Sequence, residues 1–174
     1  MRKIIKNICV ILLLVLLLLS MNSNIIYASS QITEASLVKI GDAEYHLKHY
    51  NSNKGIYTYV KVSIVGYYNE GKFYPAYCID KTSNGVGDIG SYYVDNNSVY
   101  NDNRVWRAIK NGYPYKSASE IGVSSDWNAY VVTKMAIYCI LGQSNIDDFT
   151  ADESDAEAVK MLSSLRNLVN IGLY

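Results

Sequence analysis

The sequence predicts an α+β domain, in which an antiparallel β-sheet part that carries Cys78 precedes a helical part of about three helices. Residues 36–80 combine β-branched residues and tyrosines with an alternation of apolar and polar positions, which is typical of half-buried strands. Beyond residue 101, apolar residues recur at helical spacing behind residues that cap helices. Strands first and helices after them favour the α+β class over a parallel α/β fold.

The clearest strand prediction is the extended run Ile56–Tyr68. The positions on one face of this run are Thr58, Val60, Val62 and Ile64. Asn69–Lys72 is expected to form a turn, and Phe73–Ile79 the returning strand, with Cys78 near its end. Residues 82–101 are rich in Gly, Ser, Asn and Asp, which predicts a long loop or a ragged hairpin.

Two of the three helices have clear boundaries in the sequence. Asp102 is expected to cap a short helix, which Gly112 and Pro114 end. Its apolar residues are Val105, Trp106 and Ile109. A last helix is expected over Ser154–Asn170, with Gly172 ending it.

The helix between these two contains a lysine that does not fit its pattern. Ser124 or Ser125 is expected to cap this helix, which runs to Leu141 and ends at Gly142. One stripe of the helix contains Trp127, Val131, Lys134, Tyr138 and Leu141. Lys134 either lays its stem on the core and reaches water with its amine, or faces Cys78 in a pocket.

The N-terminus has the order of a secretion signal. Basic residues precede an apolar run, Ile8–Leu19, and small residues follow from Ala28. The run is shorter than the roughly 20 apolar residues of a membrane span. We therefore expect a signal peptide over residues 1–28, a domain over residues 29–174, and a secreted or cell-surface location. An uncleaved anchor, extended by the pair Ile25-Ile26, is the alternative.

The net charge limits the kinds of partner that we expect, and the cysteine content limits the thiol chemistry. Cleavage would remove Arg2, Lys3 and Lys6 from 16 basic and 16 acidic residues, leaving 13 basic residues against 16 acidic ones, a net charge of −3. Without a block of like charge, we expect no nucleic-acid partner and no membrane contact beyond the signal segment. Cys78 and Cys139 are either a disulfide pair or include a thiol with a specific role.

Three segments carry a family resemblance. Tyr74–Asp80 contains an aromatic-Cys-hydrophobic motif, Val105–Pro114 combines a helix with the sequence NGYP, and Asp126–Tyr138 contains TKMAIY. In this order and spacing they resemble the thioester domains of Gram-positive cell-surface adhesins, whose second signature is Thr-Gln-x-Ala-Ile-aromatic. The resemblance covers residues 36–170, and because family proteins continue further, it implies a C-terminally truncated or free secreted domain.

In that family a Cys and a Gln side chain condense, with loss of ammonia, to an internal thioester that an amine on a host molecule attacks. The resemblance places Cys78 and Lys134 at these two positions, so Lys134 replaces the Gln and the thioester is expected to be absent. Gln143 lies beyond Gly142 and is not expected to substitute. The resemblance also implies pocket-flanking residues, which are Tyr77, Thr133, Ala136, Ile137 and Tyr138.

We therefore expect an adhesion module that binds a host or surface protein ligand, without enzymatic activity, cofactor or metal. One alternative is a secreted cysteine enzyme in which Cys78 is the nucleophile and His46 or His49 is the base. Another is a non-covalent binding remnant. Cys139, which lies about 140° around the helix from Lys134, is expected to be a small buried apolar residue.

Overall fold

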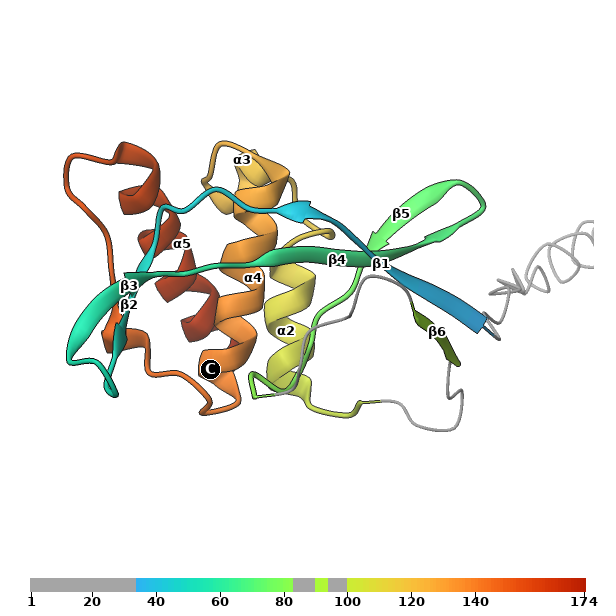
Figure 1. The fold of residues 1–174 in the computed structure, drawn as a ribbon, viewed down its shortest axis with the longest axis horizontal. Helices are drawn as coiled ribbons and strands as arrows, with labels where there is room; N and C mark the ends of the chain where they lie inside the picture. Colours follow the sequence, from blue (N-terminus) through green and yellow to red (C-terminus); the bar gives the residue numbers. More distant parts are fainter. Residues whose placement is uncertain (1–33, 83–89, 94–99) are drawn as a thin grey trace, which may run out of the picture. The chain divides into compact units, whose positions relative to one another are not determined.

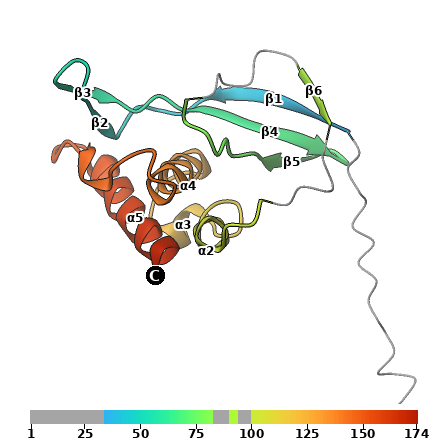
Figure 2. The ribbon, with the colours of Figure 1, turned by 90° about the horizontal axis from the view of Figure 1, so that it is seen from below.

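Two small antiparallel sheets lie over one side of a layer of helices (Figures 1 and 2). This arrangement is seen in a computed structural model that describes residues 34–82, 90–93 and 100–174. The expected signal peptide, residues 1–28, lies outside the described residues, as does most of the loop predicted over residues 82–101. The sheets and the three main helices confirm the α+β prediction.

The first sheet has the strand order β5-β4-β1-β6, and the second has the order β3-β2-β7. All neighbouring strands in both sheets pair antiparallel. The strands of the first sheet are β1 (Glu34–Asp42), β4 (Ser63–Asn69), β5 (Lys72–Pro75) and β6 (Gly90–Tyr93). The strands of the second sheet are β2 (Lys48–Asn51), β3 (Ile56–Tyr59) and β7 (Phe149–Thr150).

The run predicted as one strand, Ile56–Tyr68, is divided between the two sheets as β3 and β4. Between them the chain passes from one sheet to the other beside the segment that joins β1 to β2. The Val60 amide donates to the Leu47 carbonyl (2.8 Å), and the Ala43 amide donates to the Val62 carbonyl (2.9 Å). The alternation of faces continues through this passage, so the sequence pattern did not reveal the division.

The predicted turn joins β4 to β5, with positive φ angles at Glu70 (50°) and Gly71 (75°). The returning strand is shorter than expected, since β5 ends at Pro75 instead of Ile79. Proline has no amide hydrogen to continue a ladder. After one further bond, from the Ala76 amide to the Val65 carbonyl (2.9 Å), the chain turns towards the helices. Cys78 therefore lies in a connecting segment and not on a strand.

The helices are α2 (Asn103–Asn111), α3 (Ala118–Ile121), α4 (Asp126–Ile140), η1 (Ile146–Asp148) and α5 (Ala156–Leu173). As predicted, Asp102 caps α2 and Ser125 caps α4, each through its side-chain oxygen. The single turn α3 was not predicted, although Ser117 and Glu120 form a capping box that the sequence displays. The strand β7 and η1 were also missed, because elements of two or three residues leave no periodic signal.

Gly172 does not end the last helix, which continues to Leu173. A Cβ atom at Gly172 would clash with Cδ1 of Ile140, so the glycine permits close packing of α5 against α4. Arg107 of α2 donates hydrogen bonds to the carbonyls of Ile171 (3.1 Å) and Gly172 (2.6 Å). A cation at the negative end of the α5 dipole stabilises the final turn.

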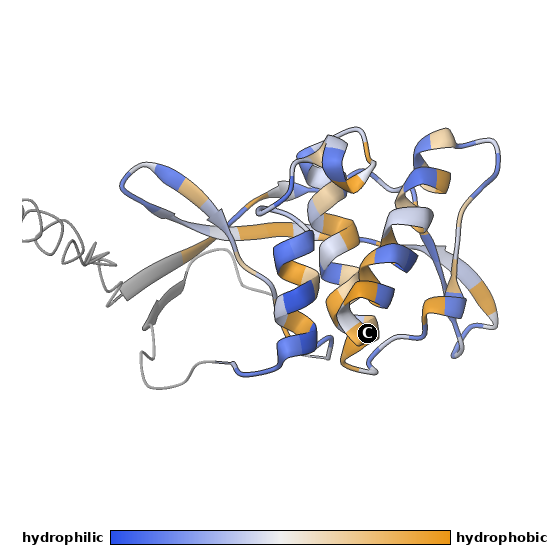
Figure 3. Cartoon of the chain, turned by 180° about the vertical axis from the view of Figure 1, so that it is seen from behind, coloured by the Kyte–Doolittle hydropathy of each residue, from blue (hydrophilic) through white to orange (hydrophobic). Residues whose placement is uncertain are grey.

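The core surrounds α4, of whose 15 residues 11 are buried. One side of the helix meets buried residues of the sheet side such as Leu47 and Ile64, and another meets Val105 and Ala108 of α2. Figure 3 shows the helical side, where polar and apolar residues alternate along α2. Across the described residues, no helix has both the length and the apolar character needed to cross a bilayer.

Candidate functional site

The candidate site lies where the segment after β5 passes over the face of α4. Cys78 is exposed, and its Sγ donates a hydrogen bond to the Asp80 carbonyl (2.9 Å). Lys134 is half-buried on α4, with its Nζ 5.9 Å from the centre of the Tyr130 ring. Burial lowers the pKa of the Lys134 amine, and the neighbouring Cys78 acts in the opposite direction. The structure thus brings together the two residues that the motifs had placed at the reactive positions.

Two tyrosines, one helical turn to either side of Lys134, complete this cluster. Burial raises the pKa of the Tyr138 phenol, and the neighbouring Cys78 raises it further. Burial also raises the pKa of Tyr130 to about 12. Sequence reasoning missed Tyr130, although its spacing of four residues from Lys134 places both on one helix face.

Tyr130 also fixes the segment that carries Cys78. Its hydroxyl donates to the Ala76 carbonyl (2.8 Å) and accepts from the Val65 amide (3.4 Å). Its ring stacks on Tyr77, with the centroids 4.9 Å apart, and the Tyr77 hydroxyl donates to the Tyr113 carbonyl (2.5 Å). The two rings therefore connect β4, the Cys78 segment and α4.

The other residues expected to flank the pocket are buried in α4. Thr133 donates to the Ala129 carbonyl (2.8 Å) and accepts from the Tyr113 amide (3.0 Å), which attaches the NGYP segment to α4. Ala136 is in the main core cluster, and Ile137 packs with the residues of α2. Of the five flanking residues, Tyr77 and Tyr138 are the ones whose side chains join the cluster around Cys78 and Lys134.

The carboxamide of Gln143 holds the Cys78 segment from the other side. Its Nε2 donates to the Ile79 carbonyl (2.7 Å), and its Oε1 accepts from the Lys81 amide (2.7 Å). Both ends of the carboxamide are thus occupied by the main chain on either side of Asp80. Gln143 therefore holds the main chain of this segment in place.

Neither histidine is joined to Cys78 by a hydrogen bond within the described residues. His46 Nδ1 lies 2.8 Å from Asp155, and its Nε2 lies 3.4 Å from Glu44. His49 packs edge-on against Phe149, with the ring centres 4.6 Å apart. The structure offers no support for an arrangement in which an imidazole activates the thiol.

The two cysteines of the domain are both free thiols. Cys139 is half-buried, and burial raises its pKa to about 12, which makes it a poor nucleophile. Its role as a small apolar residue fits the core cluster against which it packs. Over the described ranges, no group of three metal-binding side chains is found.

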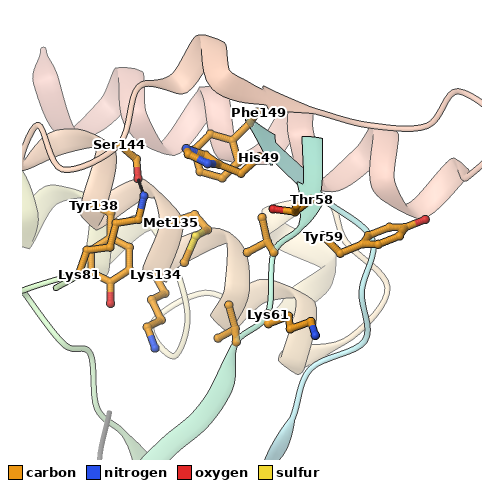
Figure 4. A pocket seen from close by; sticks show the side chains of 12 residues that line it. His49, Thr58, Tyr59, Lys61, Lys81, Lys134, Met135, Tyr138, Ser144 and Phe149 are labelled. Carbon is orange, nitrogen blue, oxygen red and sulfur yellow. Dashed lines mark hydrogen bonds between the residues drawn. The ribbon is translucent and has the colours of Figure 1, made fainter. Parts of the chain in front are cut away.

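A cavity of about 290 Å³ opens beside Lys134, between α4 and the strand β3 (Figure 4). Lys61, Lys81 and Lys134 all contribute to its lining, and we refer to it as the lysine cavity. In Figure 4, Lys134 and Tyr138 come from α4, while His49 and Phe149 meet edge to face at the opposite wall. Because residues from segments far apart in the sequence form this cavity, no local motif of the sequence indicated it.

The fold and the site around Cys78 are those of a member of the thioester domain family. The chain belongs to that family, since the family model described as thioester domain (TED) matches residues 75–170. No curated protein matches the chain.

Two solved structures have the same fold. The chain matches the Bacillus anthracis TIE protein with a TM-score of 0.62 and 18% identity, over 80% of this chain and 24% of that one. It matches the thioester domain of the Enterococcus faecium TIE86 protein with a TM-score of 0.58 and 18% identity, over 81% of this chain and 49% of that one. The chain therefore spans less than half of the length of either structure.

Proposed function

We propose that this chain is an exported, surface-acting adhesion module that binds its ligand without an internal Cys–Gln thioester. The observation that carries the proposal is the residue at position 134. A lysine lies beside Cys78, where the family signature has its glutamine. A lysine side chain has no carbonyl group, so condensation with the Cys78 thiol cannot give a thioester.

The surroundings of Cys78 support the same conclusion. Thioester formation requires a carboxamide held against the thiol in a site that excludes water. Cys78 is exposed, and the nearby carboxamide of Gln143 is engaged at both ends by the main chain. The site therefore retains the thiol of the family but not its electrophile.

Binding without a covalent bond requires a contact surface, and exposed aromatic residues offer one. Tyr68, Tyr115 and Trp127 are exposed large hydrophobic residues. They line two adjoining cavities that share Phe73, Tyr113 and Asp126, between the β4–β5 hairpin and the start of α4. Aromatic residues are enriched at protein interfaces, which favours a protein ligand on a host or other surface.

The mass of the intact protein tests the absence of a thioester. We expect the mass of the purified wild-type protein to equal the sum of its residues, and methylamine to add nothing. The measurement is intact mass spectrometry before and after incubation with the amine. A deficit of one ammonia, recovered as a methylamine adduct, would show that another carboxamide supplies the carbonyl.

A further inference from the structure

The lysine cavity has an apolar side and a cationic side. The apolar side consists of Val60, Val62, Met135 and Phe149. The cationic side contains the three lysines, and none of the lining residues is acidic. A volume of about 290 Å³ lies at the lower end of the range for ligand pockets, so it suits one small molecule.

Within the described residues, none of the three lysines forms a salt bridge with a carboxylate. Lys81 Nζ donates to the Ser144 hydroxyl (2.7 Å), and Lys61 Nζ lies 5.6 Å from the centre of the Tyr45 ring. Lys134 similarly faces the Tyr130 ring. Because the lining contains three lysines and no acidic residue, its net charge is positive, which attracts an anion.

One nitrogen of His49, a residue of the cavity wall, lacks a hydrogen-bond partner. His49 Nε2 is the only buried side-chain nitrogen or oxygen of the described residues that lacks a hydrogen-bond partner. Burial, and then the charge of Lys81, lower the pKa of this imidazole, while Asp148 opposes them. Buried polar groups in native structures are nearly always paired, so this unpaired nitrogen is a second unusual feature of the cavity wall.

We propose that the lysine cavity binds the carboxylate of a small organic acid, whose apolar body lies against Met135 and Phe149. Lys134 and Lys81 face the carboxylate, and His49 closes the site at its buried end. An inorganic anion would satisfy the lysines but would leave the apolar side without a contact. An apolar molecule without charge would leave the lysines uncompensated.

This inference rests on the proposed function, because it names the class of group that the non-covalent module binds. Two different experiments test the two proposals. The mass of the wild-type protein decides whether a thioester is present, and a binding titration decides whether the cavity binds an acid. If the protein has no thioester and does not bind carboxylates, only the inference drawn from the cavity is overturned.

The test is a titration of the purified protein with benzoate, followed by NMR of the His49 imidazole and the backbone amides. We expect saturable shifts at residues that line the cavity, with a Kd on the order of 1 mM or tighter, and binding of benzyl alcohol about tenfold weaker or more. No saturable shift would overturn the proposal, and so would equal binding of benzyl alcohol. Equal binding of sulfate would overturn the role assigned to the apolar side.

Substitutions identify the groups that recognise the carboxylate. Lys134→Met and Lys81→Met keep the length of an unbranched side chain and remove its charge, and each should weaken benzoate binding about tenfold. Lys110→Met on α2 removes the same charge from a residue that does not line the cavity, and should leave the affinity unchanged. Lys81 is exposed, so its variant is expected to fold, and wild-type affinity in that variant would contradict the proposal.

Discussion

The side chain at position 134 determines which chemistry is open to Cys78. Lys134→Gln exchanges two unbranched residues that both favour helices, so the variant should fold with a change in stability of about 1 kcal/mol or less. It restores a carboxamide beside the thiol. We expect intact mass spectrometry to show the loss of one ammonia and new reactivity toward methylamine.

The double variant Lys134→Gln with Cys78→Ala is the control for this prediction, because it retains the carboxamide and lacks the thiol. It should show its full calculated mass and no methylamine adduct. If the folded single variant also keeps its full mass, the exposure of Cys78 to water outweighs the restored carboxamide, and the site has diverged by more than one residue.

His46 gives a pH-dependent contribution to stability. Burial lowers its pKa, but Asp155 and Glu44 together outweigh burial and raise it above 6.5. The stabilisation from protonated His46 is therefore fully present below pH 6.5, and it is lost as the pH rises through the higher pKa that His46 has in the folded state. The hydrogen bond from His46 lowers the pKa of Asp155. The contribution of ionised Asp155 to stability is therefore present above pH 3.8, and it is lost as the pH falls through the lower pKa of the folded state.

We expect the difference in urea midpoint between wild-type protein and His46→Gln to be larger at about pH 5.5 than at about pH 8.5. Gln keeps a hydrogen-bonding group at this position and cannot be protonated. A difference that is equal at both pH values would show that the imidazole contributes by packing and not by its charge.

At the scale of elements, the contact between α4 and α5 depends on a position without a side chain. Gly172→Ala in a helix ordinarily stabilises by up to about 1 kcal/mol. Here the added methyl group meets Ile140 and lies 3.2 Å from the Arg104 carbonyl. Overpacking costs about 1–3 kcal/mol, so we expect a net loss of stability in thermal or urea unfolding.

Asn170→Ala, at an exposed position of the same final turn, is the matched control. It should leave the stability unchanged or raise it slightly, because alanine is the better helix former. If Gly172→Ala were as stable as this control, α5 would have to shift away from Ile140 without cost.

Caps and turns that depend on a few adjacent residues could be predicted from the sequence. Elements that depend on tertiary contacts could not. The caps Asp102 and Ser125 and the turn at Glu70 and Gly71 depend on a few adjacent residues. The division of the long strand depends on pairing with the distant segment from Ala43 to Leu47. Gly172 was interpreted as a helix end because the residues next to it in the sequence do not indicate its close packing against another helix.

The same distinction holds for the candidate site. Cys78 and Lys134 were located by motifs, which are local, and the structure brings them together. Tyr130 could have been found from its spacing on α4. The lysine cavity could not, because its cations come from the passage between β3 and β4, the Cys78 segment and α4, whose proximity only the fold determines.

At the scale of the whole molecule, the proposed role requires export. We expect N-terminal sequencing of the protein from the culture medium or cell surface to begin at Ser29 or within a few residues of it, because Ala28 ends the predicted signal peptide. A product that begins at Met1 and stays in the membrane fraction would instead identify residues 1–28 as an anchor.

The carboxamide of Gln143 imitates a peptide group. In a parallel ladder, one residue donates to the carbonyl before its partner and accepts from the amide after it. Gln143 makes this pair of bonds around Asp80, so its side chain takes the place that the main chain of a neighbouring strand would have at this residue. An Asn is too short to bridge both groups, and a Glu lacks the donor. A glutamine near a cysteine in this fold can therefore be structural, and its presence alone does not identify a reactive carboxamide.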